Sequence, residues 1–400
     1  MTDPSPGSQP GLLRMDPLAS IEDELRCLAR DGLLRHMREL AGATAEVLIC
    51  GRTIVNFSSN NYLGFADHPA VVAAIVAAAA SEGFGSGGSR LIAGNAGRHR
   101  SLERALEQWL GVERALLFGS GYQANVGLLG ALARPGDTIF SDSLNHASLI
   151  DGCRLSRAGV EVYPHLDVGS LSELVRRSTA PRKLIVTESV FSMDGDCADL
   201  AALATLARET GSILVVDDAH SVGVLGSRGS GLASGIAHVV MGAFGKAFGG
   251  FGAFVAGRSA LVELVAQRAR SFVFSTAAPA LVSAGNEAAL GLLAGVEGNT
   301  RRAALQDRIE QLTRGLSVLG LAGKSRSHIQ PILVRNPDPL AAMRVSDLLM
   351  EQGLFVQGIR PPTVPRGTSR IRISLMATHS AAHVDQLIEA LGGLRSELSG

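Results

Sequence analysis

One lysine in an apolar, glycine-rich stretch is the residue best suited to chemistry. Lys246 is the only charged residue between Val239 and Gly257, a stretch that also contains six glycines. Burial disfavours the charged ammonium form, so an amine in this setting loses its proton more readily than one in water. A neutral lysine amine can attack a carbonyl and form a Schiff base. The stretch is long enough to span a membrane, but its glycines and central lysine favour two buried strands joined by a loop that carries Lys246.

A carboxylate lies at the end of another apolar run. Asp217 follows residues 213–216 and begins the sequence Asp-Asp-Ala-His, which ends at His220. A carboxylate in this place can keep a pyridinium nitrogen protonated, so that the ring draws electrons from a substrate. A histidine three residues later could reach the phenolic oxygen of the same ring. An aspartate that only caps a helix is the plainer interpretation of an isolated Asp-Asp pair. Together with Lys246, the pair predicts an enzyme that uses pyridoxal 5'-phosphate.

A glycine-rich segment, residues 119–125, follows a predicted strand and opens a predicted helix. Free backbone N–H groups and the helix dipole at such a place favour a phosphate. The same segment matches the G-x-G-x-x-A fingerprint of dinucleotide-binding folds, so an NAD-dependent dehydrogenase is an alternative. That alternative gives no role to Lys246 or Asp217.

Two other segments hold candidate binding residues. His146 follows a strand that ends near Asp142, and its ring could stack on a planar cofactor, although most isolated histidines are structural. Near the C-terminus a proline-rich loop leads into a strand in which Arg370 and Arg372 share one face. Such an arginine could grip a carboxylate through two hydrogen bonds. A surface strand with two solvated arginines is the alternative.

Composition excludes several classes of protein. Net charge is zero and the sequence pI is about 7.2, which gives no electrostatic footprint for nucleic acid or an anionic membrane. The four cysteines are far apart in sequence, so neither a disulfide framework nor a metal site is expected and the cytoplasm is favoured. Residues 1–7 lack the basic and apolar regions of a signal peptide and are expected to form a disordered tail.

Short apolar runs alternate with helical segments from residue 112 onward, which predicts an α/β fold with a mostly parallel sheet and helices on both of its faces. The runs are 115–118, 138–140, 184–187, 213–216 and 238–240. Ligands of such sheets bind beyond the carboxyl ends of the strands. Before these runs we expect a helix over about 20–40, a hairpin over 46–57 and a helix over 69–82.

Taken together, these segments resemble the α-oxoamine synthase family of pyridoxal-phosphate enzymes from about residue 35 to 390. The resemblance implies the fold of the aspartate aminotransferases and a homodimer with shared active sites. It implies a large cofactor-binding domain over 59–290, built on the mostly parallel sheet, and a smaller α+β domain over 291–400. Residues 1–58 would form an N-terminal tail and helix that pack with the smaller domain.

The same resemblance implies a role for each candidate residue. Lys246 would bind the cofactor covalently and later move the α-proton of the substrate, with His146 as a second catalytic residue. Ser275 and Thr276 would reach the phosphate of the neighbouring subunit. The other residues expected to hold the cofactor are Asp217 at the pyridine nitrogen, His220 at the phenolic oxygen, His146 on the ring, the backbone of Gly121 and Tyr122 at the phosphate, and Ser192 nearby.

The resemblance also implies which residues would bind the substrates. Arg372, helped by Asn60, would bind the amino-acid carboxylate, and His146 would also belong to the substrate site. Arg35 and Thr363 would line the acyl-donor site. Residues 359–368 resemble the family members that join L-alanine to a pimeloyl thioester, carried by coenzyme A or a carrier protein, in biotin biosynthesis. Condensation of glycine with acetyl-CoA is the alternative within the family.

One position departs from the family pattern. A hydroxyl residue usually lies three positions before the lysine and donates to the phosphate, but this chain has Ala243 there. One hydrogen bond to a charged group, typically worth about 1.5–3 kcal/mol, is therefore missing. A relative without catalytic activity is a further alternative because of this residue.

Overall fold

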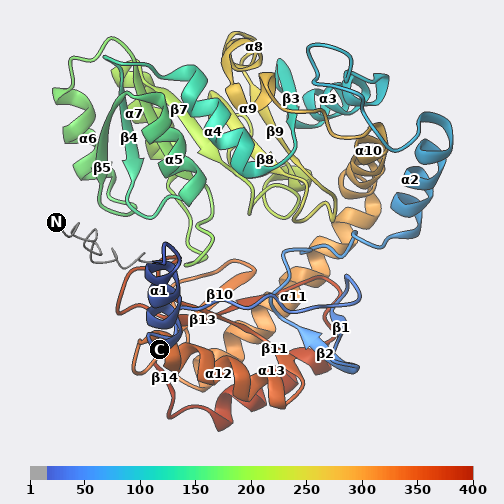
Figure 1. The fold of residues 1–400 in the computed structure, drawn as a ribbon, viewed down its shortest axis with the longest axis vertical. Coiled ribbons are helices and arrows are strands. Elements are labelled where there is room, and N and C mark those ends of the chain that lie inside the picture. Colours follow the sequence, from blue (N-terminus) through green and yellow to red (C-terminus); the bar gives the residue numbers. More distant parts are fainter. Residues whose placement is uncertain (1–15, 400) are drawn as a thin grey trace, which may run out of the picture.

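The computed structural model describes residues 16–399, and its largest sheet has seven strands in the order β3-β9-β8-β7-β6-β4-β5 (Figure 1). Six of these strands are parallel, and β9 runs antiparallel to its neighbours β3 and β8. This confirms the predicted α/β class with a mostly parallel sheet, and each of the five apolar runs forms a strand. The strands are β3 (Arg114–Phe118), β4 (Thr138–Asp142), β5 (Gly159–Tyr163), β6 (Lys183–Glu188), β7 (Ile213–Asp217), β8 (Val239–Ala243) and β9 (Ala253–Gly257).

Helices cover both faces of this sheet because successive strand side chains point to opposite sides. In β7, for example, Leu214 and Val216 belong to one hydrophobic core and Val215 to the other. The core of Val215 includes residues of α4 (Gly121–Leu132), α5 (Ala147–Ser156), α8 (Ser259–Arg268) and α9 (Arg270–Val273). The opposite core includes residues of α2 (Pro69–Glu82), α3 (Gly97–Leu110), α6 (Val168–Arg177), α7 (Leu200–Thr210) and α10 (Ala280–Ala294).

Two smaller sheets lie together in the other half of the molecule (Figure 1). One has the order β12-β13-β10-β14, and the other, β1-β2-β11, joins the predicted N-terminal hairpin to a C-terminal strand. Their strands are β1 (Glu46–Ile49), β2 (Arg52–Asn56), β10 (Ile329–Val334), β11 (Leu354–Phe355), β12 (Gln357–Ile359), β13 (Arg370–Ser374) and β14 (Leu398–Ser399). The remaining helices here are α11 (Val296–Val318), α12 (Pro339–Glu351) and α13 (Ala381–Gly393), while a short 3-10 helix, η1 (Ser227–Gly229), follows β7.

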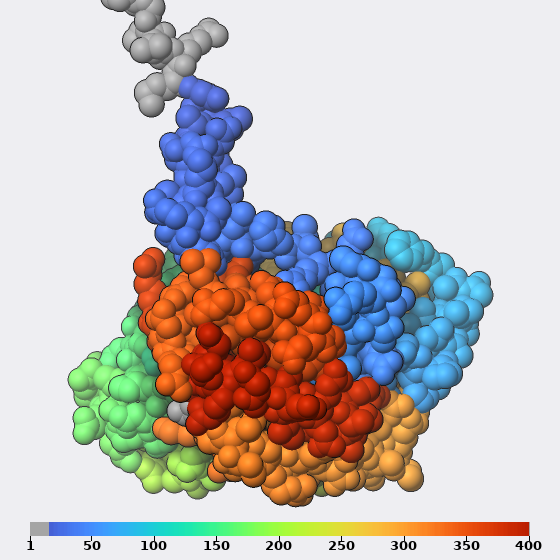
Figure 2. All heavy atoms as spheres, turned by 90° about the horizontal axis from the view of Figure 1, so that it is seen from below, coloured from blue at the N-terminus to red at the C-terminus, as the bar shows by residue number. Residues whose placement is uncertain are grey.

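The first helix is shorter than its sequence pattern predicts. Helix α1 covers Ala19–Arg30 rather than about 20–40, because Gly32 adopts a left-handed conformation (φ 67°) and the Leu33 and Leu34 amides turn back to donate to Leu28 O. None of its residues is buried, and Figure 2 shows it projecting from the rest of the molecule. The predicted disordered tail, residues 1–7, lies outside the described residues. Across residues 16–399, no helix combines the length and hydropathy needed to cross a membrane.

Candidate active site

Three neighbouring or nearby parallel strands each end in an acidic residue. The register of β6 and β7 places Glu188 beside Asp217, and Asp217 in turn pairs with Met241 of β8. Asp142 ends β4, the other neighbour of β6. The turn after β8 carries Lys246, so the lysine approaches the same edge of the sheet. This is the edge at which the sequence predicted a ligand site.

The turn of Lys246 links two buried strands, as predicted. Gly249 in this turn has φ 64°, and a Cβ atom there would collide with the backbone of Phe65 and Ala66, so only glycine fits. Within residues 16–399, the Lys246 amine has no hydrogen bond to the protein. Burial lowers the pKa of Lys246 from 10.5 to about 8, although Asp217 and Glu188 oppose the shift. Far more of this lysine is therefore neutral near physiological pH than of an ordinary lysine, although the larger part stays charged.

Asp217 is held by hydrogen bonds from uncharged side-chain and backbone groups. Asn125 Nδ2, from α4, donates to Asp217 Oδ2 at 2.8 Å, and the Ala219 amide donates to Asp217 Oδ1 at 3.0 Å. The same Asn125 amide group donates to Ser148 Oγ at 2.9 Å. Since Ser148 Oγ lies 2.8 Å from His146 Nδ1, the network connects the carboxylate to the predicted stacking histidine.

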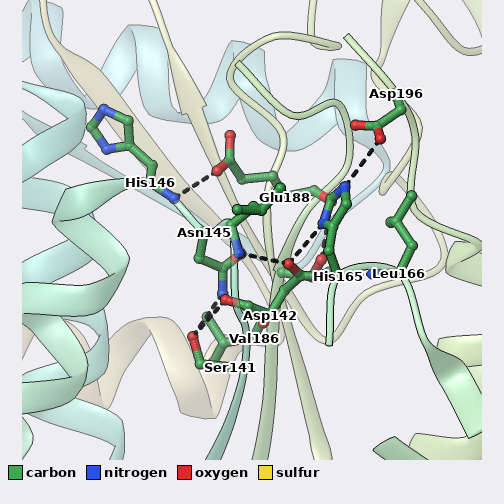
Figure 3. A network of polar contacts seen from close by, with 11 residues as sticks. Ser141, Asp142, Asn145, His146, His165, Leu166, Val186, Glu188 and Asp196 are labelled. Atoms are coloured by element: carbon green, nitrogen blue, oxygen red, sulfur yellow. Dashed lines mark hydrogen bonds and ion pairs between the residues drawn. The ribbon is translucent and has the colours of Figure 1, made fainter. Parts of the chain in front are cut away.

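His146 caps the N-terminus of helix α5. Its Nδ1 accepts the Ser148 N–H at 3.2 Å, and its own backbone N–H donates to Glu188 Oε1 at 2.6 Å (Figure 3). Burial lowers the pKa of His146 despite the nearby charge of Asp217. Burial also raises the pKa of Glu188 well above 4.5, and Asp217 adds to this shift. The histidine ring is therefore neutral at physiological pH and fixed by its helix cap.

A second chain of contacts joins His220 to Arg372. Tyr62 OH lies 2.7 Å from His220 Nδ1 and donates to Asn60 Oδ1 at 3.0 Å. Asn60 Oδ1 also lies 3.4 Å from both terminal nitrogens of Arg372. Burial lowers the pKa of His220 well below 6.5, and Lys246 and Arg372 contribute to the shift. The structure thus brings together the predicted residues Asn60, His220 and Arg372.

Arg372 is buried, not solvated. Its Nε donates to Ser192 O at 2.6 Å and its Nη1 to Ser374 Oγ at 2.9 Å. Arg370, on the same face, pairs with Asp194 and donates to Met193 O at 3.3 Å. Only 6% and 7% of Arg370 and Arg372 are exposed, which excludes the alternative of a surface strand. Ser192 approaches the candidate site through its carbonyl oxygen.

The predicted phosphate site lies at the start of helix α4. Gly121 and Tyr122 occupy the first two helical positions, where backbone N–H groups have no intrahelical acceptor. Ser120 caps the helix by accepting the Gln123 N–H, and the Tyr122 side chain points away to donate to Asp151 Oδ2 at 2.8 Å. Ser275 and Thr276 line a cavity together with Gly119 and Gln123. Their reach to a second subunit stays a prediction.

Arg35 and Thr363 meet in a separate groove. Arg35 Nη2 donates to Thr363 Oγ1 at 3.3 Å and to Pro361 O at 3.4 Å. The groove has a volume of about 640 Å³ and is lined by residues of 29–40, α12, β12 and the loop after β12. Its lining does not include Lys246, Asp217 or His220. Arg35 and Thr363 are therefore close to each other, but they form no part of the cluster of Lys246, Asp217 and His220.

Sequence reasoning missed four residues of the site. Glu188 ends a strand, so the argument that located Asp217 could also have found it. Asn125 lies in the glycine-rich segment, but nothing in the sequence connects it to Asp217. Tyr62 and His328 come from segments far apart in the chain, and their rings pack in a T-shaped arrangement with 4.0 Å between the centroids. His328 is completely buried, and neither ring nitrogen has a hydrogen-bond partner within residues 16–399.

The residues present fit pyridoxal phosphate. An amine without a protein partner, a buried carboxylate, two neutral histidines and the N–H groups of α4 match the groups of that cofactor in number and type. The Asp217 side chain is already oriented by Asn125, which leaves its carboxylate placed at the strand end beside Lys246.

Three comparisons with known proteins agree. An 8-amino-7-oxononanoate synthase from Geobacter sulfurreducens is 45% identical over 393 residues, covering 95% of this chain and 98% of the relative. A solved structure of SPT (serine palmitoyltransferase) with a PLP internal aldimine is 29% identical, covers 94% of this chain and 96% of its own, and has a TM-score of 0.87. The 8-amino-7-oxononanoate synthase structure from Francisella tularensis is 30% identical, covers 85% and 97%, and has a TM-score of 0.73.

The match to a family model decides the assignment. The model for aminotransferase class I and II matches residues 52–391, which includes every predicted site residue except Arg35. The chain belongs to the class I and II aminotransferase family.

Proposed function

We propose that this chain is a pyridoxal-phosphate-dependent acyltransferase that condenses L-alanine with a pimeloyl thioester to give 8-amino-7-oxononanoate. A thiol and carbon dioxide are the other products. The observation that carries the proposal is the position of Lys246, an amine with a pKa of about 8 that lies at the sheet edge near Asp217 and Glu188. The near full-length relative from Geobacter sulfurreducens, which bears the name of this activity, supports the choice of substrates.

The chain's own residues would hold the cofactor at its four groups. Asp217 would bind the pyridine nitrogen, His220 the phenolic oxygen, His146 the ring face and the α4 amides of Gly121 and Tyr122 the phosphate, with Ser192 nearby. Bound pyridoxal phosphate supplies an electron-withdrawing ring that stabilises negative charge on the α-carbon of an amino acid. Asn125 keeps the Asp217 carboxylate in one orientation, so that it stays aimed at its partner.

Lys246 would serve as the base that removes the α-proton. Proton transfer is efficient when the pKa of the base lies near the working pH, and burial brings this lysine into that range. Asp217 and Glu188 raise the pKa of Lys246 and so keep it from falling further.

Arg372 would bind the amino-acid carboxylate. Its Nε is held by Ser192 O, and its terminal nitrogens face Asn60, so the guanidinium is fixed before a substrate arrives. A fixed carboxylate determines which bond at the α-carbon is aligned for cleavage, and this orientation supplies much of the rate. Arg372 thereby contributes to both binding and decarboxylation.

Several further features belong to the proposal. The groove of Arg35 and Thr363 would admit the acyl donor, carried by coenzyme A or by a carrier protein. A cytoplasmic homodimer would bring Ser275 and Thr276 to the phosphate of the neighbouring subunit. Residues 59–290 and 291–400 would act as a large and a small domain, with the segment that ends at residue 58 joined to the latter by the pairing of β2 with β11.

An absorption titration tests the function. Purified protein with pyridoxal phosphate is titrated with L-alanine and then with glycine, for the wild type and for Lys246→Ala. We expect a Lys246-dependent visible band that L-alanine perturbs preferentially, followed by thiol release when pimeloyl-CoA is added. Preference for glycine, with thiol release from acetyl-CoA, would instead indicate a glycine C-acetyltransferase. Absence of any Lys246-dependent band would overturn the cofactor assignment.

A further inference from the structure

A histidine with no assigned role bridges two carboxylates beside the candidate site. His165 lies in the turn between β5 and α6, with Nδ1 2.9 Å from Asp142 Oδ1 and Nε2 3.0 Å from Asp196 Oδ2 (Figure 3). Because both partners are carboxylates, both ring nitrogens donate and the ring carries a positive charge. The ring also packs edge-on against Phe191, at 4.4 Å between centroids.

The charge state of this histidine is set by its two neighbours. Burial alone lowers the pKa of His165, but the hydrogen bonds and charges of Asp142 and Asp196 outweigh it and raise the pKa to about 10. Asp142 is only 2% exposed, so a cationic partner removes the cost of burying its charge. The three side chains therefore form a charged bridge at neutral pH.

The first carboxylate belongs to the turn that presents His146. Asp142 Oδ1 accepts the Leu144 amide at 2.9 Å, and Asp142 O accepts the Asn145 amide at 3.2 Å. Asn145 Nδ2 then donates to Val186 O at 2.9 Å, which fixes the turn on β6. The next residue is His146, whose backbone donates to Glu188.

The second carboxylate belongs to the loop that holds Arg372. In the loop 189–197, the Phe191 amide donates to Asp196 O at 3.0 Å, and the Gly195 amide donates to Phe191 O at 2.8 Å. Ser192, inside this closed loop, accepts the Arg372 Nε–H. A shift of Asp196 would therefore move the carbonyl that orients the guanidinium.

We propose that His165 is a positioning residue for amino-acid binding: its bridge between Asp142 and Asp196 holds the loop 189–197 against the turn 142–146. It thereby sets the relative positions of Arg372 and His146, two of the side chains expected to contact the amino acid. His165 itself contacts neither of them. The inference rests on the proposed function, because it assumes an amino acid that Arg372 binds.

Two single variants, their combination and one control variant test the bridge. His165→Asn keeps a donor for Asp142 but removes the charge and the reach to Asp196, and Asp196→Asn removes the second charge with little change of shape. His383→Asn is the matched control, because its ring makes an exposed ion pair with Glu46 at 3.1 Å. For each cofactor-loaded protein the measurements are the dissociation constant of L-alanine by spectral titration, the KM of pimeloyl-CoA and the melting temperature.

We expect His165→Asn and Asp196→Asn each to weaken L-alanine binding about ten-fold, since small misplacements of a binding group have effects of this order. The double variant should bind L-alanine no more weakly than the single variant with the lower affinity, because both changes break the same link. The KM of pimeloyl-CoA should stay at its wild-type value in these variants. The His383→Asn variant should match the wild type in all three measurements.

Two outcomes would overturn the inference alone. In the first, the wild type binds L-alanine and the bridge variants bind it equally well. In the second, binding of both substrates weakens in proportion to a lowered melting temperature, which would indicate general destabilisation. If His165→Asn does not fold, Asp196→Asn decides by the same criteria. A wild type that binds no amino acid would overturn the proposed function, and this inference would fall with it.

Discussion

Asn125 Nδ2 donates to Asp217 Oδ2 at 2.8 Å, so a residue of the helix that would bind the phosphate also orients the carboxylate at the end of β7. The two residues are 92 positions apart, and the contact forms because α4 packs on the face of the sheet beside β8 and β9. One helix thus helps to define two ends of the candidate cofactor site.

Replacement of Asn125 should weaken the binding of pyridoxal phosphate. Asn125→Ala removes a hydrogen bond to a charged group, worth about 1.5–3 kcal/mol, so the dissociation constant should rise about ten-fold or more. Ser148→Ala is the matched control, because it removes only the neighbouring branch of the network and should have a smaller effect. Titration of the cofactor-free protein by absorbance measures both. Equal affinities for Asn125→Ala and the wild type would contradict the role of this contact.

Loss of the Tyr62 hydroxyl should destabilise the fold. In Tyr62→Phe the buried His220 Nδ1 loses its partner at 2.7 Å, and an unpaired buried polar group costs about 1–3 kcal/mol. Tyr122→Phe removes a hydroxyl whose contact with Asp151 is exposed, so its effect on stability should be near zero. Urea unfolding of the cofactor-free proteins compares the two variants. The prediction fails if both lower the free energy of unfolding equally.

Arg372 should affect the amino acid and not the acyl donor. Arg372→Lys retains a positive charge but loses the planar pair of donors, so the KM of L-alanine should rise about ten- to a hundred-fold. The KM of pimeloyl-CoA should stay near its wild-type value, since the groove of Arg35 and Thr363 does not include Arg372. Steady-state kinetics with each substrate varied in turn provide the measurement. A parallel rise in both constants would argue against a carboxylate site at Arg372.

The burial of Lys246 predicts a pH dependence of stability. Its pKa is about 8 in the folded chain and 10.5 for the ordinary side chain, so between these values the unfolded chain binds more protons and stability rises with pH. Below pH 8 the charged lysine costs about 3 kcal/mol. Lys246→Met should therefore be more stable than the wild type at pH 7, by a margin that shrinks as the pH approaches 10.

Urea unfolding of cofactor-free protein between pH 7 and 10 measures this margin. Lys324→Met, which replaces an exposed lysine, is the control and should show no such trend. A margin for Lys246→Met that is constant with pH would show that the lysine is not held at a lowered pKa.

Ala243 offers a gain-of-affinity experiment. Ala243→Ser restores the hydroxyl that family members usually have three residues before the lysine, so pyridoxal phosphate should bind about ten-fold more tightly. The gain should vanish with pyridoxal, which lacks the phosphate. An equal gain for both compounds would show that the serine acts through something other than the phosphate.

Local pattern was enough to predict the α/β class and the Lys246 loop. Burial of a parallel sheet on both faces requires continuous apolar runs, and the chemistry of a neutral lysine requires apolar surroundings. Both features can therefore be recognised from residues adjacent in the sequence. The end of α1 was mispredicted because the leucine spacing continues past Gly32, although the backbone there has already left the helix.

The sequence by itself determined the fold class, the lysine and the strand-end carboxylate, since each depends on residues close together in the chain. Only the tertiary structure decided which side chains from distant parts of the sequence contact one another in and around the site. The contacts of Tyr62 with His220 and of His165 with Asp142 and Asp196 depend on how strands and loops are stacked, and no local spacing encodes that packing. The burial of Arg372 was likewise decided by the loop 189–197 that covers it.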